Sequence, residues 1–484
     1  MCPASLFHPE FRNISWVFVM IFLLGSVSPL VAQEQQQNLA NQIVQRSFID
    51  DLPTIKKRKR IRALVTYSRT DFFFSVDRTP KGLQVDLLQE YEKKLNAGIK
   101  QETERVQVQY IPTTFDRLIP DLLEGKGDIA AALLTITPER ENKINFISSK
   151  RQKVKELVVT HNSIKDIESV EDLSGREVYV LKGSSYVEHL RELNEVFKEK
   201  DLQPIQVIEA DSHLLSEDIL ELVNSGIVKI TVVDHYKAKI WAKVLPDIQV
   251  LDAVSVKNDA SVGWGIRKNN PELQKSLNSF LKKVKKGTLL GNMLFNRYYR
   301  KTKWIDNPNA DKERQKLSAV IELFEKYANQ FGFDYLAIAA QGYQESRLDQ
   351  SRRSHRGAVG IMQLLPSTAA DKNVGISDIS KAEDNIHAGM KYMAFIRDRY
   401  FADPEISQED RMAFSWAAYN AGPAKVQTMR NQARKMGLNP NVWHANVELA
   451  AGKIVGRETV KYVSNIFKYY IAYSLVRDQQ RLSN

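Results

Sequence analysis

Cysteine is nearly absent from this chain, which has 484 residues and one cysteine, Cys2. Cys2 precedes the first apolar segment, so cleavage after that segment would leave no thiol for a disulfide or a metal. The histidines His355, His387 and His444 are not spaced as zinc ligands usually are. We therefore expect no metal ion and no cofactor.

The sequence also lacks a long hydrophobic run. The apolar segment from Ile14 to Leu24 is short for a membrane span of about 20 residues. Small residues and Pro29 follow it, and a glutamine-rich run begins after Ala32. This layout predicts a signal peptide over residues 1–32, with an uncleaved anchor as the alternative. Either way the chain is exported, and export without disulfides favours a bacterial periplasm. There we expect peripheral association with the outer membrane.

Acidic residues are fewer than basic ones, 58 against 69, so the net charge is +11. The basic residues are spread along the chain, with one tight cluster from Lys56 to Arg60. For an exported protein, an anionic wall polymer or a membrane surface is a better partner than nucleic acid. The alternative for the cluster is a solvated entry to the first strand.

The hydrophobic pattern divides the chain into two kinds of structure. Residues 33–56 are expected to form a linker with a short helix. Strand and helix patterns then alternate over residues 57–300, which predicts an α/β module with a largely parallel sheet. A second α/β unit covers about 151–255, after which the chain returns to the first unit, made of about 57–150 and 256–300. A polar linker over 301–314 precedes an all-α domain, 315–484, with apolar residues at helical spacing.

A glutamate ends an apolar helix in the C-terminal domain. The helix begins near Asp334, a plausible N-cap, and its last turn contains Glu345. Burial beside a cleft would raise the pKa of this carboxyl group, as a general acid at neutral pH requires. Taken alone, Glu345 is better read as a surface residue.

Four short motifs change that interpretation. They are Glu345-Ser346, Gly360-Ile361-Met362-Gln363, Ala418-Tyr419-Asn420 and Glu458-Thr459-x-x-Tyr462-Val463. In this order they resemble the catalytic domain of the soluble lytic transglycosylases, which has a goose-lysozyme-like fold. Asn385, Gly389 and Tyr392 fit the same pattern. The resemblance implies cleavage of the β-1,4 bond between N-acetylmuramic acid and N-acetylglucosamine in peptidoglycan.

The resemblance also implies roles for these residues. Glu345 would protonate the glycosidic oxygen and then act as base while the 6-hydroxyl of the muramic acid attacks its own anomeric carbon. The product is a 1,6-anhydro end, formed without water. The glycan cleft would be lined by Ser346, Gln363, Tyr419, Asn420, Glu458 and Tyr462. Among these, Ser346 and Glu458 are expected mainly to orient other groups.

Two other functions stay open at this stage. Asp349 lies four residues after Glu345 and would share its face if the helix continued, which would allow a hydrolytic muramidase. Alternatively the chain is a solute receptor whose helical domain holds the wall without cleaving it.

Residues 57–300 resemble the family 3 solute-binding proteins of amino-acid uptake systems. The motifs that carry this resemblance are Gly82-Leu83-Gln84-Val85-Asp86-Leu87, Thr135-Ile136-Thr137-Pro138-Glu139-Arg140 and Val262-Gly263-Trp264-Gly265-Ile266-Arg267. The implied architecture is a periplasmic-binding-protein-like module of two α/β lobes with a ligand in the cleft between them.

The residues suggest how this module would bind a muropeptide or an amino acid. Arg140 can hold a carboxylate through a bidentate pair, although an ion pair with a neighbouring glutamate is the alternative. Thr135 and the helix start at Ser184 offer hydroxyl and backbone donors. Asp234, at the end of an apolar strand, could meet an ammonium group.

Overall fold

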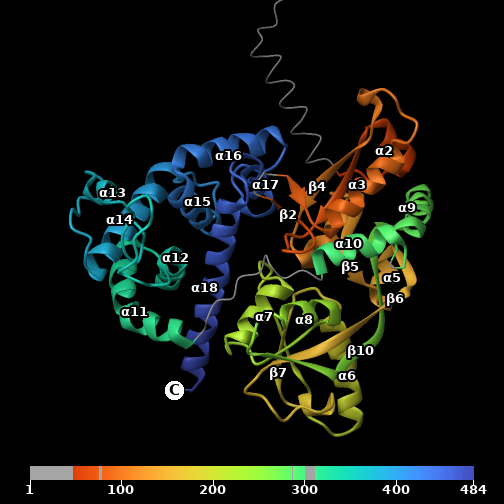
Figure 1. The fold of residues 1–484 in the computed structure, drawn as a ribbon, viewed down its shortest axis with the longest axis horizontal. Coiled ribbons are helices and arrows are strands. Elements are labelled where there is room, and N and C mark those ends of the chain that lie inside the picture. The colour runs from red at the N-terminus through yellow and green to blue at the C-terminus, as the bar shows by residue number, and fades with distance from the viewer. Residues whose placement is uncertain (1–46, 76–78, 286, 300–310, 484) are drawn as a thin grey trace, which may run out of the picture.

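The computed structural model describes residues 47–75, 79–285, 287–299 and 311–483 (Figure 1). The expected signal peptide, Cys2 and most of both expected linkers lie outside these ranges. Among the described residues, no helix is long and apolar enough to cross a membrane. The chain forms a two-lobed α/β module and a helical domain, as the sequence predicts.

Lobe I is built on three parallel strands. The side chains of the two inner strands are mostly buried because helices pack against both faces of the sheet, whereas those of the edge strand are mostly half-buried. The strands are β1 (Arg60–Val65), β4 (Gln107–Pro112) and β5 (Ile129–Thr135). The helices are α2 (Leu52–Lys57), α3 (Leu83–Leu95), α4 (Leu118–Leu123), α5 (Pro138–Lys143), α9 (Pro271–Val284) and α10 (Leu289–Tyr299).

Two long strands join the lobes. β6 (Ile144–His161) carries the chain from lobe I into lobe II, and β10 (Ile248–Arg267) brings it back antiparallel to β6. The result is one six-stranded sheet in the order β4-β1-β5-β10-β6-β9. The expectation of a largely parallel sheet was wrong, because outgoing and returning strands that pair side by side must run in opposite directions.

Lobe II adds a second, smaller sheet. Strands β7 (Glu177–Val180) and β8 (Gln206–Glu209) pair in parallel, while β9 (Ile230–Asp234) joins the edge of β6. The helices of this lobe are α6 (Ser185–Glu199), α7 (Ser216–Asn224) and α8 (His235–Trp241).

The C-terminal domain is built from helices joined by loops. Its helices are α11 (Asp311–Phe331), α12 (Tyr335–Ser346), α13 (Pro366–Ala370), α14 (Ala382–Tyr400), α15 (Gln408–Ala421), α16 (Pro423–Lys435), α17 (Glu448–Ile454) and α18 (Arg457–Ser483). Most of them share one apolar core that includes Phe324, Trp416 and Ile466, while α13 packs in a smaller cluster with α14.

Helix α18 lies between the helical domain and the two-lobed module (Figure 1). Its Val463 and Ile466 are buried in the core of the helical domain. Nearer the C-terminal end of α18, Ala472 is buried in the core of lobe II with Trp241 and Leu245. The helix therefore belongs to both packing units.

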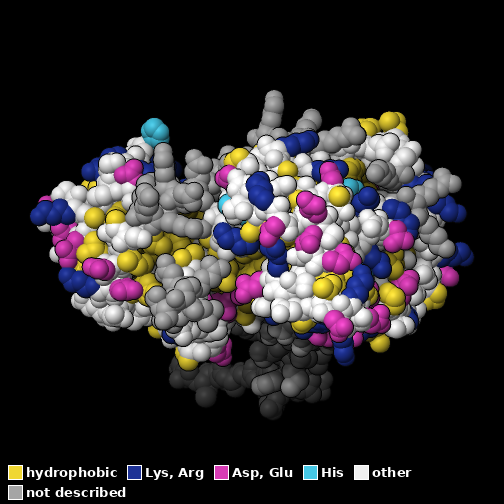
Figure 2. All heavy atoms as spheres, turned by 90° about the horizontal axis from the view of Figure 1, so that it is seen from below, with side chains coloured by type: hydrophobic (Ala, Val, Ile, Leu, Met, Phe, Trp, Pro, Cys, Tyr) yellow, Lys and Arg dark blue, Asp and Glu magenta, His cyan; other side chains and the backbone are white. Residues whose placement is uncertain are grey.

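The charged surface shows no single-sign patch on the face drawn in Figure 2, where acidic and basic side chains are interspersed over the two-lobed module. The basic cluster at Lys56–Arg60 is partly neutralised: Arg58 pairs with the buried Asp128, and the ammonium of Lys59 lies 2.6 Å from Glu104. These pairs leave less of the cluster available to an anionic polymer.

Candidate active site

Helix α12 positions Glu345. The Asp334 side chain caps the helix by accepting a hydrogen bond from the Leu336 N–H at 2.9 Å. The helix is buried along most of its length, and it ends sharply because Arg347 and Leu348 adopt left-handed backbone angles, with φ of 61° and 57°. Glu345 is thereby held in the last turn, at the side of α18.

The carboxyl group of Glu345 meets a tyrosine from α18. The Tyr462 hydroxyl donates a hydrogen bond to Glu345 Oε1 at 2.5 Å. Burial raises the pKa of Glu345 from 4.5 to about 7, against the opposing effects of Tyr462 and the cationic Arg352. Near neutral pH a large fraction of this carboxyl group is therefore protonated and can donate a proton.

The loop that contains the motif Gly360–Gln363 is held beside Glu345 by hydrogen bonds from three helices. The Ser346 hydroxyl donates to Ile361 O at 2.9 Å, and the Tyr419 hydroxyl donates to Met362 O at 2.8 Å. From α14, Asn385 Oδ1 accepts from the Met362 N–H at 2.8 Å. These contacts give Ser346 and Tyr419 a role in fixing the loop.

Gln363 and Asn420 are engaged with protein groups. Gln363 has a φ of 46°, and its amide donates to Gly360 O at 2.8 Å and Arg352 O at 3.3 Å. Asn420 accepts a hydrogen bond at 2.8 Å from the hydroxyl of Thr459 on α18. The sequence motif includes Thr459 without assigning it a role, although it lies one helical turn before Tyr462 on the same face of α18.

Glu458 and Asp349 are placed differently from Glu345. Glu458 is exposed at the start of α18, whereas its neighbour Thr459 is buried. Helix α12 ends at Ser346, so the continued helix that would bring Asp349 onto the face of Glu345 does not form. Asp349 Oδ1 instead accepts from the N–H and the hydroxyl of Ser351, at 2.9 and 2.6 Å.

Arg140 joins the two lobes of the N-terminal module. Its Nε lies 2.7 Å from Glu188 on α6, and its Nη2 donates to Gly183 O at 2.9 Å. A third bond, from Nη1 to Thr135 O at 3.2 Å, stays within lobe I. The guanidinium is thus surrounded by protein acceptors, and Thr135, Arg140 and Ser184 are brought together where the lobes meet.

Asp234 is a buried acid in lobe II. Burial raises its pKa from 3.8 to about 6, and the Tyr236 hydroxyl donates to Oδ2 at 2.8 Å. Among the described residues, Asp234 Oδ1 and Ser184 Oγ are buried without a hydrogen-bond partner. A buried polar atom without a partner is costly, so both atoms are suited to receive a polar ligand.

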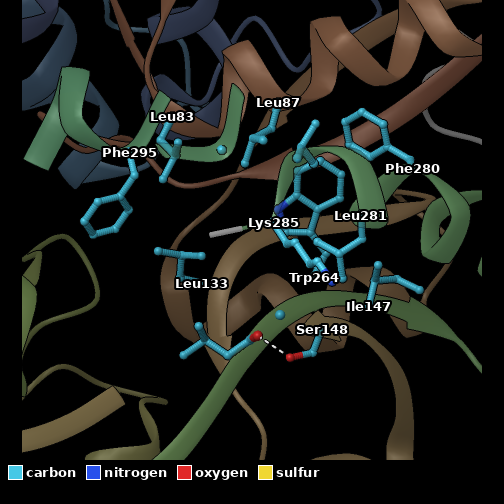
Figure 3. Close-up of a pocket in the computed structure, with 14 residues that line it drawn as sticks. Leu83, Leu87, Leu133, Ile147, Ser148, Trp264, Phe280, Leu281, Lys285 and Phe295 are labelled. Atoms are coloured by element: carbon cyan, nitrogen blue, oxygen red, sulfur yellow. Dashed lines mark hydrogen bonds between the residues drawn. The ribbon is translucent and has the colours of Figure 1, made fainter. Parts of the chain in front are cut away.

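A separate apolar cavity lies in lobe I and has a volume of about 90 Å³. Figure 3 shows the apolar side chains around it, which come from α3, α9, α10 and the sheet, and include Leu83, Trp264, Phe280 and Phe295. Neither Arg140 nor Asp234 lines it. The cavity is therefore distinct from the polar site predicted between the lobes.

Comparison with known proteins agrees with this division of the chain. Residues 61–300 match the family of bacterial extracellular solute-binding proteins, family 3, and residues 322–441 match the transglycosylase SLT domain. Membrane-bound lytic murein transglycosylase F of Desulfosudis oleivorans is 28% identical over 443 residues, covering 88% of this chain and 92% of that protein. The chain is a homologue of the membrane-bound lytic murein transglycosylases F.

Two further similar proteins are as follows. The Pseudomonas fluorescens Pf-5 protein of the same name is 28% identical, covering 86% of this chain and 85% of that protein. A solved ancestral arginine-binding protein bound to arginine is 25% identical, with a TM-score of 0.41, and covers 50% of this chain and 99% of that one.

The C-terminal helical domain, which contains the SLT match and is called the SLT domain from here on, contacts the solute-binding module through a buried charge cluster. Lys468 of α18 pairs with Glu221 and lies 4.0 Å from Asp218, both on α7. Arg69 of lobe I lies 2.9 Å from Glu221. Despite burial, Lys468 and Arg69 hold the pKa of Glu221 below its usual range, whereas burial raises that of Asp218 to about 6. Both lobes and α18 thus meet at one electrostatic junction.

A groove between the modules runs along α18 beside this junction. Its walls include Tyr67 and Phe74 from lobe I, Leu215 from lobe II, and Val460 and Asn465 from α18. The Asn465 amide also donates to Gln344 Oε1 at 3.1 Å, next to Glu345 in sequence. The solute-binding module therefore packs against the helix that supplies Tyr462 to the active site.

Proposed function

We propose that this chain is a peptidoglycan lytic transglycosylase with Glu345 as its acid and base. It would cleave the β-1,4 bond between N-acetylmuramic acid and N-acetylglucosamine and leave a 1,6-anhydro-muramic acid end. The observation that supports this best is the desolvated carboxyl group of Glu345, with a pKa of about 7 and the Tyr462 hydroxyl at 2.5 Å.

The reaction then uses one carboxyl group twice. Protonated Glu345 donates its proton to the glycosidic oxygen as the bond to the muramic acid anomeric carbon breaks. The resulting carboxylate, stabilised by the Tyr462 hydroxyl, accepts the proton of the muramic acid 6-hydroxyl as that oxygen attacks the anomeric carbon. No water is consumed, and Glu345 is protonated again at the end of the cycle.

The surroundings of Glu345 favour this route over hydrolysis. Burial accounts for the raised pKa of Glu345, and no second carboxyl group of the described chain adds to it. Ordinary retaining or inverting glycosidases need a second carboxylate for a nucleophile or for water activation. The hydrogen bonds of Asp349 to Ser351 support the same choice.

We infer that the remaining motif residues support the glycan cleft. Tyr419 and Ser346 would hold the loop that contains Gln363, while Asn420 and Thr459 would form one wall on the α15–α18 side. Glu458 would act at the exposed rim.

The solute-binding module is proposed to bind an amino acid or a muropeptide between its lobes. Asp234 Oδ1 and Ser184 Oγ are the buried atoms suited to this, and a ligand carboxylate would have to displace Glu188 from Arg140. Binding would change how the lobes meet α18 and so alter access to the catalytic cleft. Titration with amino acids and purified muropeptides tests this: no affinity for either would eliminate the sensing role.

The place of action is proposed to be the periplasm, peripheral to the outer membrane. Two features support this: the apolar run from Ile14 to Leu24, with a change to polar sequence after Ala32, and the proposed peptidoglycan substrate. Fractionation of cells expressing the full chain would test it, since recovery in the cytosol would contradict the proposal.

Mass spectrometry of digested peptidoglycan is the deciding experiment. The purified protein should release muropeptides one water lighter than their hydrolysed counterparts, and Glu345→Gln should release none. Glu325→Gln is a matched control, because Glu325 is an exposed glutamate on α11. Reducing ends that carry the added water would instead favour a muramidase. A wild-type protein that releases nothing would favour a receptor that only holds the wall.

A further inference from the structure

A loop of lobe II reaches the SLT domain through a histidine. Residues 211–214 lie between β8 and α7, and the ring of His213 packs on His444 of the SLT domain with centroids 4.1 Å apart. Phe467 of α18 stacks on His213 at 5.3 Å and also contacts His444. Two imidazoles from different modules are thus held against each other by an aromatic side chain.

A carboxylate completes a set of three donor groups. Glu409, at the start of α15, places Oε1 3.3 Å from His213 Nε2. One ring nitrogen from each histidine and one carboxylate oxygen all lie within 4.8 Å of one another. In a tetrahedral site with arms of about 2.0–2.1 Å, neighbouring ligand atoms are about 3.3 Å apart. The three groups are therefore close to the spacing that one small divalent ion requires.

The orientation of His213 is fixed in the way that metal-binding histidines usually are. Its Nδ1 lies 2.7 Å from Asp211 Oδ1, which leaves Nε2 directed at Glu409. A carboxylate behind the imidazole sets the tautomer and makes the other nitrogen a better ligand. Asp211 also accepts the His213 N–H at 2.9 Å, so the loop itself holds this arrangement.

The ring of His444 gives independent support for a bound ion. Its Nε2 is buried and, within the part of the chain that the structure describes, has no hydrogen-bond partner. Buried polar atoms of this kind are rare and are frequently explained by an ion or a water. Glu409 is exposed, so an ion could enter from solvent and keep a water in the fourth position.

We propose that His213, His444 and Glu409 bind one divalent ion of the zinc type, which ties lobe II to the SLT domain. Two imidazoles and one carboxylate suit Zn²⁺, and Ni²⁺ or Cu²⁺ would bind the same groups. His213 comes from one module, and His444 and Glu409 come from the other. The ion binds only when the modules are docked, and by the same linkage it stabilises the docked arrangement. This site is separate from Glu345 and does not depend on the proposed catalytic activity.

Titration with ZnCl₂ tests the proposal. The full-length protein, purified without a histidine tag and stripped with a chelator, should bind one equivalent of Zn²⁺ by calorimetry. We expect His444→Ala to abolish this binding and Glu409→Gln to weaken it at least about tenfold. Asp211→Asn should weaken it by about 10–100-fold, as loss of a supporting carboxylate does.

Two controls make the result decisive. His355→Gln removes an exposed histidine of another loop and should leave the affinity unchanged. Glu409→Gln alters an exposed side chain, so its effect does not depend on a disturbed core. The proposal is overturned if the wild-type chain binds no Zn²⁺, or if Glu409→Gln and His444→Ala both bind it as tightly as the wild-type chain.

Discussion

Replacing Tyr462 with phenylalanine tests the central electrostatic feature of the active site. The Tyr462 hydroxyl donates to Glu345 at 2.5 Å and lowers the pKa of this carboxyl group, while burial raises it, and the net value is about 7. A hydrogen bond to a charged group contributes about 1.5–3 kcal/mol. One pKa unit corresponds to about 1.36 kcal/mol, so loss of this hydrogen bond should raise the pKa of Glu345 by about 1–2 units.

The measurement is the initial rate of anhydro-muropeptide release as a function of pH. In the wild-type enzyme, kcat/KM should fall as pH rises through about 7, because Glu345 loses the proton that it must donate. In Tyr462→Phe this decline should move to higher pH, while the maximal rate falls because the carboxylate formed during the reaction is less stabilised.

Tyr419→Phe is the matched control. The Tyr419 hydroxyl donates to Met362 O at 2.8 Å, so its loss should leave the position of the pH decline unchanged, whatever it does to the rate. The reasoning is refuted if Tyr462→Phe keeps the wild-type pH profile, or if both variants shift it equally.

Three further predictions concern stability. Lys468→Met should destabilise the chain by about 3–5 kcal/mol, because it leaves Glu221 buried with one cation fewer; a thermal midpoint equal to that of the wild-type chain would contradict this. Asp234 has a folded pKa of about 6 against an ordinary 3.8, so stability should fall by about 3 kcal/mol as pH rises from below 3.8 through 6. Asp234→Asn should remove that pH dependence in denaturant titrations and be the more stable form above about pH 7. A Cβ on Gly389 would lie 2.6 Å from Met362, so Gly389→Ala should cost about 1–3 kcal/mol and lower activity by moving the loop that Tyr419 holds; unchanged melting and activity would show that the loop adapts.

The sequence predicts much of this architecture because local patterns and tertiary packing agree over most of it. The helix that ends at Glu345 is an example: its cap, its apolar body and its polar last turn are all visible in residues 334–346. The full length of β10 is not evident from the sequence, because around Leu251–Asp259 most side chains are half-buried or exposed and do not show the apolar alternation of a buried strand.

The parts that could not be predicted depend on contacts between distant segments. Tyr462 reaches Glu345 across 117 positions of sequence, and only the packing of α12 against α18 fixes that distance. His213 and His444 come from different modules, so spacing along the chain gives no sign that their rings meet. Helix α12 ends at Ser346 because Arg347 adopts a left-handed backbone conformation, and this end separates Asp349 from Glu345. An arginine at this position does not predict such a conformation.

The course of β6 and β10 has a consequence for how this protein folds. β10 lies between β5 and β6 in the sheet, yet more than one hundred residues of chain separate β5 (Ile129–Thr135) from the part of β10 that pairs with it. Lobe I is therefore incomplete until lobe II and the return strand have been made. Contacts of such long sequence separation form slowly. The sheet therefore closes late, and until it does the edges of β5 and β6 that β10 occupies lack their partner strand.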